Sequence, residues 1–207
     1  MARPPLSFRR LSGLDRSGPE PPQTRPGEPL HPWTIPNAIG FVRLALIPVF
    51  LVAGLRSDTG TDVVPAILFA VVAWSDYADG IAARVTGQFS RFGALLDPVV
   101  DRLLVIAGIV VCWVHELLPR WALAVLVARE LLMLAGGRYA LSRGAELHIN
   151  WWGRLAVWPV MSAIFAGLVG WSTVGAVLLY VGLALALAAT VDYARTARAQ
   201  LRVRDEP

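Results

Sequence analysis

Cysteine is almost absent from this 207-residue sequence, since Cys112 stands alone inside an apolar run. One cysteine excludes a disulfide framework and a metal site built from several thiolates. The three histidines, His31, His115 and His148, are widely separated along the chain, which argues against a shared histidine metal site. Lysine is missing altogether, because all 19 basic residues are arginine.

Apolar residues, in contrast, are abundant. Hydrophobic residues make up 56% of the sequence and the mean hydropathy is +0.55, which is too apolar for an ordinary soluble domain. Crossing a hydrocarbon core of about 30 Å takes roughly 20 mostly apolar residues in a helix. The sequence therefore predicts an all-α membrane protein with six transmembrane helices. The predicted spans are Ala38–Leu55, Val63–Ala83, Gly93–Trp113, Trp121–Leu141, Trp151–Gly170 and Val174–Val191.

The positive charge of the chain is arranged by membrane side. The formal net charge is +4, but the arginines form no patch of the kind that binds nucleic acid. Only Arg56 and Arg120 fall in the loops that follow the first and third spans, and most of the others lie on or near the opposite side. Under the positive-inside rule, this distribution predicts that both termini are cytoplasmic.

The ends of the chain differ in composition from its middle. Residues 1–32 are rich in proline, arginine, serine and glycine, and cannot bury enough apolar area to offset chain entropy. We expect a disordered cytoplasmic tail there. An interfacial tryptophan and a helix-start signal follow at Trp33–Asn37. We predict a folded domain over residues 33–195 and a basic cytoplasmic C-terminal tail over residues 196–207.

Four aspartates lie at or inside the cytoplasmic ends of the second and third predicted spans. On each of these helices, two aspartates share a face with small residues. The short link between the helices makes them antiparallel neighbours, so the two stripes can face each other. The first stripe is Asp76, Asp79, Gly80 and Ala83, and the second is Gly93, Asp97 and Asp101.

These four carboxylates need compensation. A lone aspartate near a bilayer centre costs about 2.5–3.5 kcal/mol on insertion scales, and close carboxylates also repel each other. Hard oxygen ligands suit Mg²⁺ or Mn²⁺, and two such ions can share bridging carboxylates. We therefore predict a binuclear site for two divalent cations. Helix capping with surface salt bridges is the structural alternative.

The small residues and one arginine extend the predicted site. Gly80, Ala83 and Gly93 remove side-chain bulk, which lets a ligand or a neighbouring backbone approach the metals. Arg84 lies near the cytoplasmic surface, where it can meet a phosphate or an acidic partner. The glycines can equally serve tight helix packing, and Arg84 can be a positive-inside anchor alone.

Four further arginines are candidates for binding an anionic acceptor. Arg129 falls near the middle of the fourth span and should face the bundle interior, because an unpaired charge in lipid is costly. It can pair with Glu130 or a motif carboxylate, or contact the acceptor. Arg138, Arg143 and Arg154 lie nearer the inner surface and can receive an acceptor phosphate, or can simply follow the positive-inside rule.

The arrangement Asp-x2-Asp-Gly-x2-Ala-Arg-x8-Gly-x3-Asp-x3-Asp, which begins at Asp76, resembles the signature of the CDP-alcohol phosphatidyltransferases at every fixed position. The six-span layout extends the resemblance to about residues 33–195. The resemblance implies transfer of a phosphatidyl group from CDP-diacylglycerol to an alcohol in phospholipid biosynthesis, with release of CMP. It also implies a polar cavity open to the cytoplasm, and a homodimer in the cell membrane.

The resemblance implies a role for each motif residue. Asp76, Asp79 and Asp97 would ligate metal, and Asp101 would complete the second metal site and act as the catalytic general base. The residues implied in CDP binding are Asp79, Gly80, Ala83, Arg84 and Gly93.

Three short patterns bear on the acceptor alcohol. Ile35-Pro36-Asn37, Ala128-Arg129-Glu130 and Gly153-Arg154 are similar to the branch of the family that uses glycerol-3-phosphate or phosphatidylglycerol. We predict glycerol-3-phosphate first, which would make the enzyme a phosphatidylglycerophosphate synthase. That branch often has Gly-Lys-x-Lys-Thr where this chain has Gly153–Val157, so a cardiolipin synthase using phosphatidylglycerol stays open, and inositol phosphate is third.

A cation or proton transporter is the alternative from another functional class, because buried carboxylates also mark ion pathways. Release of CMP that depends on CDP-diacylglycerol and a divalent metal distinguishes the two classes.

Overall fold

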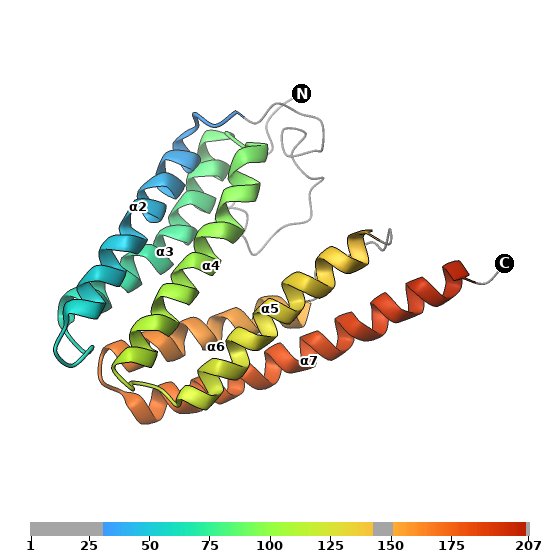
Figure 1. Ribbon diagram of the computed structural model, residues 1–207. Coiled ribbons are helices and arrows are strands. Elements are labelled where there is room, and N and C mark those ends of the chain that lie inside the picture. Colours follow the sequence, from blue (N-terminus) through green and yellow to red (C-terminus); the bar gives the residue numbers. More distant parts are fainter. Residues whose placement is uncertain (1–30, 143–150, 206–207) are drawn as a thin grey trace. The chain divides into compact units, whose positions relative to one another are not determined.

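The computed structural model describes residues 31–142 and 151–205, and all regular secondary structure in these ranges is helical (Figure 1). The predicted all-α class is thereby confirmed. The predicted tail up to residue 30 and the segment 143–150, which includes Arg143, lie outside the described residues. The helices are α2 (Ile35–Arg56), α3 (Val63–Thr86), α4 (Arg91–Val114), α5 (Arg120–Ser142), α6 (Trp151–Leu168) and α7 (Ser172–Asp205).

Helix α2 begins where the sequence predicts a helix start. Thr34 is its N-cap, and the Thr34 hydroxyl accepts a hydrogen bond from the backbone N–H of Asn37 at 3.3 Å. Pro36 lies in the first turn, where the missing N–H costs nothing because no helical partner exists for it. These residues therefore fix the entry of the chain into the first predicted span.

Within the part of the chain that the structure describes, three helices are long and apolar enough to cross a membrane: α2, α3 and the Ser172–Tyr193 part of α7. The apolar part of α6, Leu155–Leu168, is shorter. Helices α4 and α5 have the length, but each carries three charged residues beyond its first turn. These residues are Asp97, Asp101 and Arg102 on α4, and Arg129, Glu130 and Arg138 on α5. The chain is therefore a membrane protein by its apolar helices, and the count of six spans stays a prediction.

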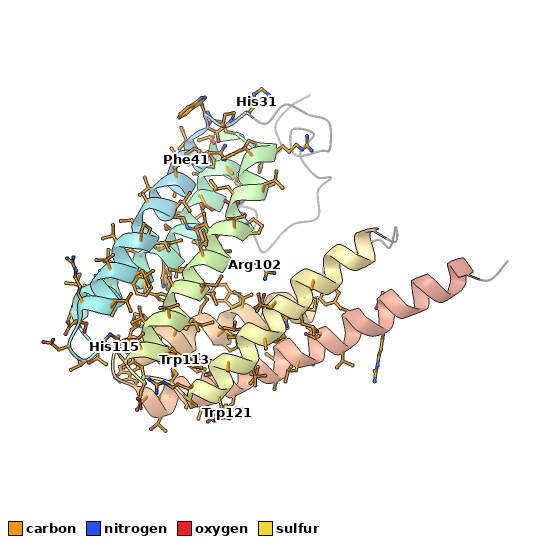
Figure 2. The ribbon with its side chains drawn as sticks, viewed as in Figure 1. His31, Phe41, Arg102, Trp113, His115 and Trp121 are labelled. Carbon is orange, nitrogen blue, oxygen red and sulfur yellow. The ribbon has the colours of Figure 1, made fainter. Side chains whose placement is uncertain are left out.

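Large apolar side chains are exposed along these helices. Trp74 and Trp158 are 77% and 75% exposed, and Trp113 and Trp121 lie near the end of α4 and the start of α5 (Figure 2). Water would oppose so much exposed apolar surface, whereas lipid tails are a favourable solvent for it. The exposed surface therefore agrees with a membrane location.

The chain divides into two compact units, each with its own packing. In the first unit, which contains α2, α3 and α4 up to Gly108, the rings of Phe50 and Phe69 pack at 5.5 Å between centroids. In the second unit, which contains residues 58–62 and the chain from Ile109 onward, α6 packs along α7. A Cβ at Gly182 would lie 2.7 Å from Val160, so this contact between α6 and α7 depends on glycine.

Helix α7 continues well past its apolar part, to Asp205. The segment 196–205, which the sequence analysis assigned to a basic C-terminal tail, is therefore helical. The arginines at its end thus lie on the continuation of an apolar helix, where such residues are favoured next to a membrane surface.

Candidate functional site

Residues 87–90 form the link that returns the chain from α3 to α4, within the first unit. Gly87 has a φ of 67°, a left-handed conformation that glycine adopts without strain. The Ser90 hydroxyl then accepts a hydrogen bond from the backbone N–H of Gly93 at 2.9 Å, which caps the start of α4. This short, capped link places the two carboxylate-bearing helices side by side (Figure 1).

Asn37 ties the start of α2 to the start of α4. Its side chain is buried and its amide nitrogen donates to the carbonyl of Pro32 and to the Ser90 hydroxyl, both at 2.9 Å. A Cβ at Gly93 would lie 2.5 Å from the amide oxygen of Asn37. Gly93, predicted to line the CDP cleft, is therefore also the position where α4 makes room for this amide.

We expect Gly93→Ala to destabilise the protein by about 1–3 kcal/mol, because the added methyl group must displace the buried Asn37 amide. Gly136→Ala is the matched control, since a Cβ there meets nothing within 4 Å and alanine favours a helix interior. Thermal unfolding in detergent measures the stability of both variants. Equal melting temperatures for the two variants would contradict this account of Gly93.

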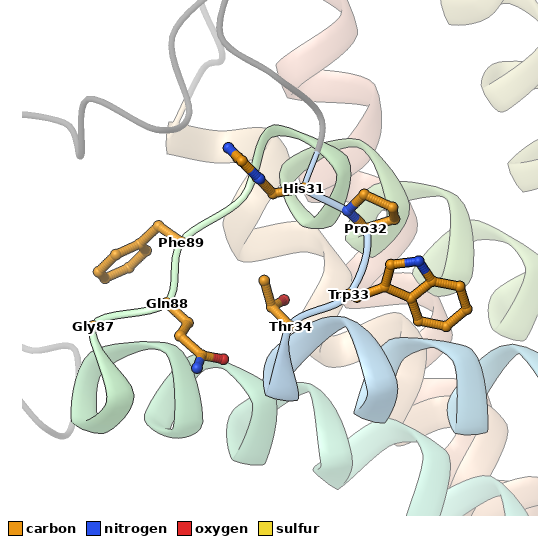
Figure 3. A pocket seen from close by; sticks show the side chains of 7 residues that line it. All are labelled: His31, Pro32, Trp33, Thr34, Gly87, Gln88 and Phe89. Atoms are coloured by element: carbon orange, nitrogen blue, oxygen red, sulfur yellow. The ribbon is translucent and has the colours of Figure 1, made fainter.

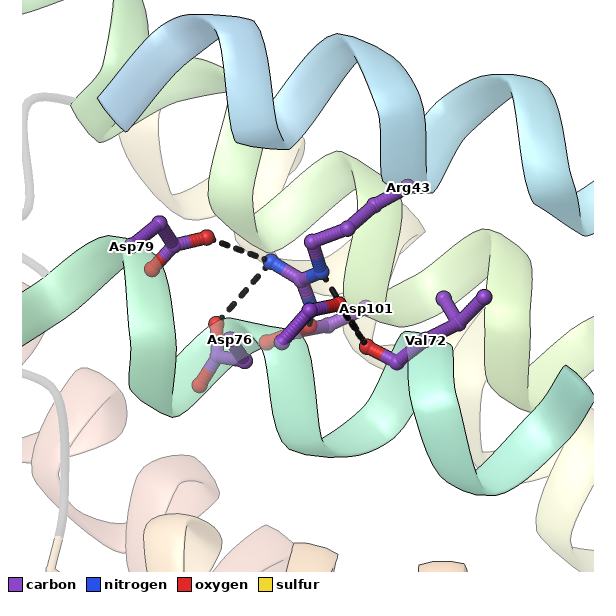
Figure 4. Close-up of polar contacts among 6 residues, drawn as sticks. Arg43, Val72, Asp76, Asp79 and Asp101 are labelled. Carbon is purple, nitrogen blue, oxygen red and sulfur yellow. Dashed lines mark hydrogen bonds and ion pairs between the residues drawn. The ribbon is translucent and has the colours of Figure 1, made fainter. Parts of the chain in front are cut away.

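Three of the four predicted metal ligands meet around one guanidinium group, that of Arg43 on α2 (Figure 4). One of its terminal nitrogens, Nη1, contacts Asp76 Oδ1 at 3.1 Å and Asp79 Oδ2 at 3.0 Å. The other, Nη2, contacts Asp101 Oδ1 at 2.7 Å. The predicted meeting of the α3 and α4 stripes is therefore real for these three carboxylates.

Arg43 itself was not among the predicted site residues. Its side chain is 1% exposed, and Nε donates to the Val72 carbonyl at 3.2 Å. The signal that could have found it is an arginine inside the first apolar span, because such a charge must be paired. By the same rule Arg129 was predicted to face the bundle interior, whereas no partner was predicted for Arg43.

The carboxylates differ in their exposure. Asp79 is 8% exposed, whereas Asp76 and Asp101 are 49% and 36% exposed. Asp97 lies one turn before Asp101, near enough to Asp76 and Asp79 for the charges to interact. Arg43 therefore closes the buried side of the carboxylate cluster, and the opposite side is open.

No three carboxylate, imidazole or thiolate groups converge on a single ion position within residues 31–142 and 151–205. The guanidinium of Arg43 takes the central place among three of the carboxylates instead. It contacts one oxygen of each, and the second oxygen of each is not engaged by it. The donor set nevertheless has the all-oxygen chemistry that Mg²⁺ and Mn²⁺ prefer.

Arg84 lies over Gly80 on α3. Its Nη2 is 3.3 Å from the position that a Cβ on Gly80 would occupy. Among the described residues, no group accepts a hydrogen bond from the buried Nε of Arg84. Ala83, the small residue one position before it, is partly exposed. A guanidinium with one buried donor unused is suited to receive an anion.

Of the predicted acceptor-binding arginines, Arg129 is the one whose side chain the structure describes. Arg129 on α5 forms an ion pair with Glu130, and its Nε donates to the Thr190 hydroxyl on α7 at 2.9 Å. The ion pair with Glu130 is one of the alternatives that the sequence left open for Arg129. Arg138 and Arg154 lie in α5 and α6 by their backbone positions.

A pocket of about 410 Å³ lies where the start of α2 meets the α3–α4 link (Figure 3). The Gln88 side chain accepts a hydrogen bond from the Ile35 N–H at 3.0 Å there. None of the predicted site residues lines this pocket, so it is not the predicted polar cavity. The lining residues are His31, Pro32, Trp33, Thr34, Gly87, Gln88 and Phe89.

Comparison with known proteins agrees with the motif. The family model for CDP-alcohol phosphatidyltransferase matches residues 33–188. The CDP-diacylglycerol–glycerol-3-phosphate 3-phosphatidyltransferase of Bacillus subtilis is 32% identical over 147 residues, which cover 65% of this chain and 76% of that protein. The enzyme of the same name from Pectobacterium atrosepticum is 30% identical over 181 residues, covering 82% of this chain and 97% of that protein.

A second kind of relative is similar over a shorter stretch. The cardiolipin synthase (CMP-forming) of Streptomyces coelicolor is 37% identical over 134 residues, which cover 63% of this chain and 62% of that protein. The matching family model covers most of this chain and includes both carboxylate stripes. The chain therefore belongs to the CDP-alcohol phosphatidyltransferase family, which confirms the prediction of a transferase that uses a CDP-alcohol.

Proposed function

We propose that this protein transfers a phosphatidyl group from CDP-diacylglycerol to glycerol-3-phosphate and releases CMP. One observation carries the proposal most directly. The carboxylates of Asp76 and Asp79 from α3 and of Asp101 from α4 all contact the buried guanidinium group of Arg43. These signature carboxylates therefore lie close enough together to act on a common substrate. Family membership supports the donor, and the relatives named for glycerol-3-phosphate support the acceptor.

Two divalent cations, Mg²⁺ or Mn²⁺, would be held by Asp76, Asp79, Asp97 and Asp101. Arg43 leaves one oxygen of Asp76, Asp79 and Asp101 outside its contacts, and it does not hydrogen-bond Asp97. The donor set therefore fits hard cations. When bound, such ions supply positive charge against the pyrophosphate of the donor and the departing CMP.

The CDP moiety would bind along the small-residue stripes. Gly80 and Ala83 follow Asp79 on α3, and Gly93 is near the start of α4. The Arg84 guanidinium lies over Gly80, and its buried Nε, which no described group engages, would donate to a phosphate oxygen. The diacylglycerol chains would stay in lipid, against the exposed apolar side chains of the helices.

Asp101 would act as the general base. Its Oδ1 is held by Arg43, and the carboxylate lone pairs that neither Arg43 nor a cation uses would accept the proton of the acceptor hydroxyl. The hydroxyl oxygen then bonds to the β-phosphorus as the bond from that phosphorus to the bridging oxygen breaks. CMP leaves with the bridging oxygen. The partial exposure of Asp101 agrees with a group that must meet a substrate.

The membrane arrangement belongs to the same proposal. Six spans, a polar cavity open to the cytoplasm, both termini on the cytoplasmic side of the cell membrane, and a homodimer would complete the enzyme. The positive-inside rule supports the orientation, with Arg56 expected outside and Arg195 inside.

Labelling of single cysteines tests the orientation, because Cys112 is the only native cysteine. In a Cys112→Ser background, we expect a membrane-impermeant maleimide to label Asp58→Cys in intact cells and Arg195→Cys only after the membrane is opened. Labelling of both positions in intact cells, or of Arg195→Cys alone, would contradict the proposed topology.

Cardiolipin synthesis from phosphatidylglycerol is the second candidate, supported by the similarity to the Streptomyces coelicolor protein. Thin-layer analysis of the lipid product separates the two. We expect purified protein with CDP-diacylglycerol and Mg²⁺ to convert glycerol-3-phosphate into phosphatidylglycerophosphate. Cardiolipin made from phosphatidylglycerol, with no product from glycerol-3-phosphate, would contradict the first acceptor and favour the second.

We expect Arg129→Gln to impair folding more than acceptor binding, because Arg129 is already paired with Glu130 and Thr190. The melting temperature should fall, while the KM for glycerol-3-phosphate of the folded fraction stays within about threefold of wild type, a smaller change than the loss of a charged hydrogen bond to the acceptor would cause. A rise in that KM without loss of stability would assign Arg129 to the acceptor instead.

A further inference from the structure

The side chain of Arg43 links its own helix, α2, to two other helices of the first unit. It projects from α2, its Nε donates to the Val72 carbonyl on α3 at 3.2 Å, and its terminal nitrogens reach carboxylates on α3 and α4 (Figure 4). The Val72 carbonyl is a fixed backbone acceptor inside a helix. One donor of the guanidinium is therefore anchored independently of the carboxylates that the group contacts.

We propose that Arg43 is the positioning residue of the metal site, holding the α3 and α4 carboxylates close to one another before metal and substrate bind. The inference rests on the proposed function, because it assumes that the carboxylates ligate metal. The first span contributes no carboxylate to the site, but through Arg43 it would orient three of them.

The pattern of contacts favours positioning over simple charge neutralisation. A guanidinium has a rigid fork of donors, and here each contacted carboxylate gives it only one oxygen. Each carboxylate is therefore turned so that its second oxygen faces away from Arg43. Outer-shell hydrogen bonds of this kind commonly orient metal-ligating groups.

Charge and orientation make opposite predictions for metal affinity. If Arg43 were only a competing positive charge, its removal would relieve repulsion and a divalent cation would bind more tightly. If Arg43 orients the ligands, its removal leaves Asp76, Asp79 and Asp101 to repel each other and turn apart, so the cation binds more weakly.

Mn²⁺ binding to the full-length protein in detergent tests the inference, measured by electron paramagnetic resonance without any lipid substrate. We expect Arg43→Gln to weaken Mn²⁺ binding by about 10–100-fold, the usual effect of losing an outer-shell partner. Arg43→Lys keeps the positive charge but lacks the planar set of guanidinium donors, so its Mn²⁺ affinity should lie between those of Arg43→Gln and wild type. Arg120→Gln is the control, because Arg120 is half-exposed, pairs with Glu116 and belongs to the second unit.

A second readout separates positioning from a general folding defect. At saturating Mn²⁺ we expect the kcat of Arg43→Gln to recover most of the wild-type value, which a misfolded protein would not do. If Arg43→Gln does not fold, the Mn²⁺ affinity and the kcat at saturating Mn²⁺ are measured on Arg43→Lys instead.

The outcomes that overturn the inference differ from those that overturn the proposed function. Wild-type Mn²⁺ affinity, or tighter binding, in both Arg43 variants would overturn the positioning role alone. A wild-type protein that binds no Mn²⁺ would overturn the proposed metal site, and the role of Arg43 with it.

Discussion

Asp101→Asn should lower the rate of CMP release by about 10²–10⁴-fold, the usual contribution of a positioned general base. Asparagine has nearly the same shape and keeps an oxygen in place of the Oδ1 that accepts from Arg43 at 2.7 Å. It has no lone pair basic enough to take the proton of the acceptor hydroxyl. The variant should therefore fold normally and lose the reaction.

The measurement is CMP release from CDP-diacylglycerol, with the melting temperature taken in parallel. Asp58→Asn is the matched control, because Asp58 lies in the link between α2 and α3 and is exposed. It should retain wild-type activity. Activity within a few-fold of wild type in Asp101→Asn would remove Asp101 from the role of general base.

Chelation of divalent metal should abolish transfer in the wild-type protein but leave it folded. The resident Arg43 already compensates Asp76, Asp79 and Asp101, so the emptied cluster does not leave these carboxylates facing only each other. The reaction, in contrast, loses the positive charge that the pyrophosphate requires. We expect CMP release to fall more than about 100-fold and to return when Mg²⁺ or Mn²⁺ is added.

The same chelation should unfold the Arg43→Gln variant more readily. Without the guanidinium, the buried Asp79 and its half-exposed neighbours have no counter-ion, and we expect stability to fall by about 1–3 kcal/mol. Thermal unfolding with and without chelator measures how much stability the wild-type protein and the Arg43→Gln variant each lose. If both proteins lose equal stability on chelation, Arg43 does not compensate the cluster.

Much of the architecture follows from local sequence rules. Apolar runs of membrane-spanning length predicted each helix to within a few residues at most ends, and Thr34 marked the start of α2 through its capping hydroxyl. The C-terminal end of α7 was not predicted, because residues 196–205 carry too many polar residues to belong to an apolar span, although they continue the preceding helix.

The carboxylate cluster was predictable because its residues are close in sequence and follow helical spacing. Asp76 and Asp79 share a helix face, and a four-residue link brings α4 alongside. Arg43 and Asn37 were not predicted as parts of the site, because their partners lie 33–58 residues away along the chain. Sequence spacing gives no information about contacts of that kind, although a charge inside an apolar span indicates that a partner must exist.

The most direct test of the account is CMP release by the purified protein when CDP-diacylglycerol, an alcohol acceptor and a divalent metal are supplied together and then omitted one at a time. The account predicts CMP and a phosphatidyl product only when all three are present. Divalent metal binding without CMP release from any acceptor, together with metal-dependent ion flux in liposomes, would contradict it and favour a transporter.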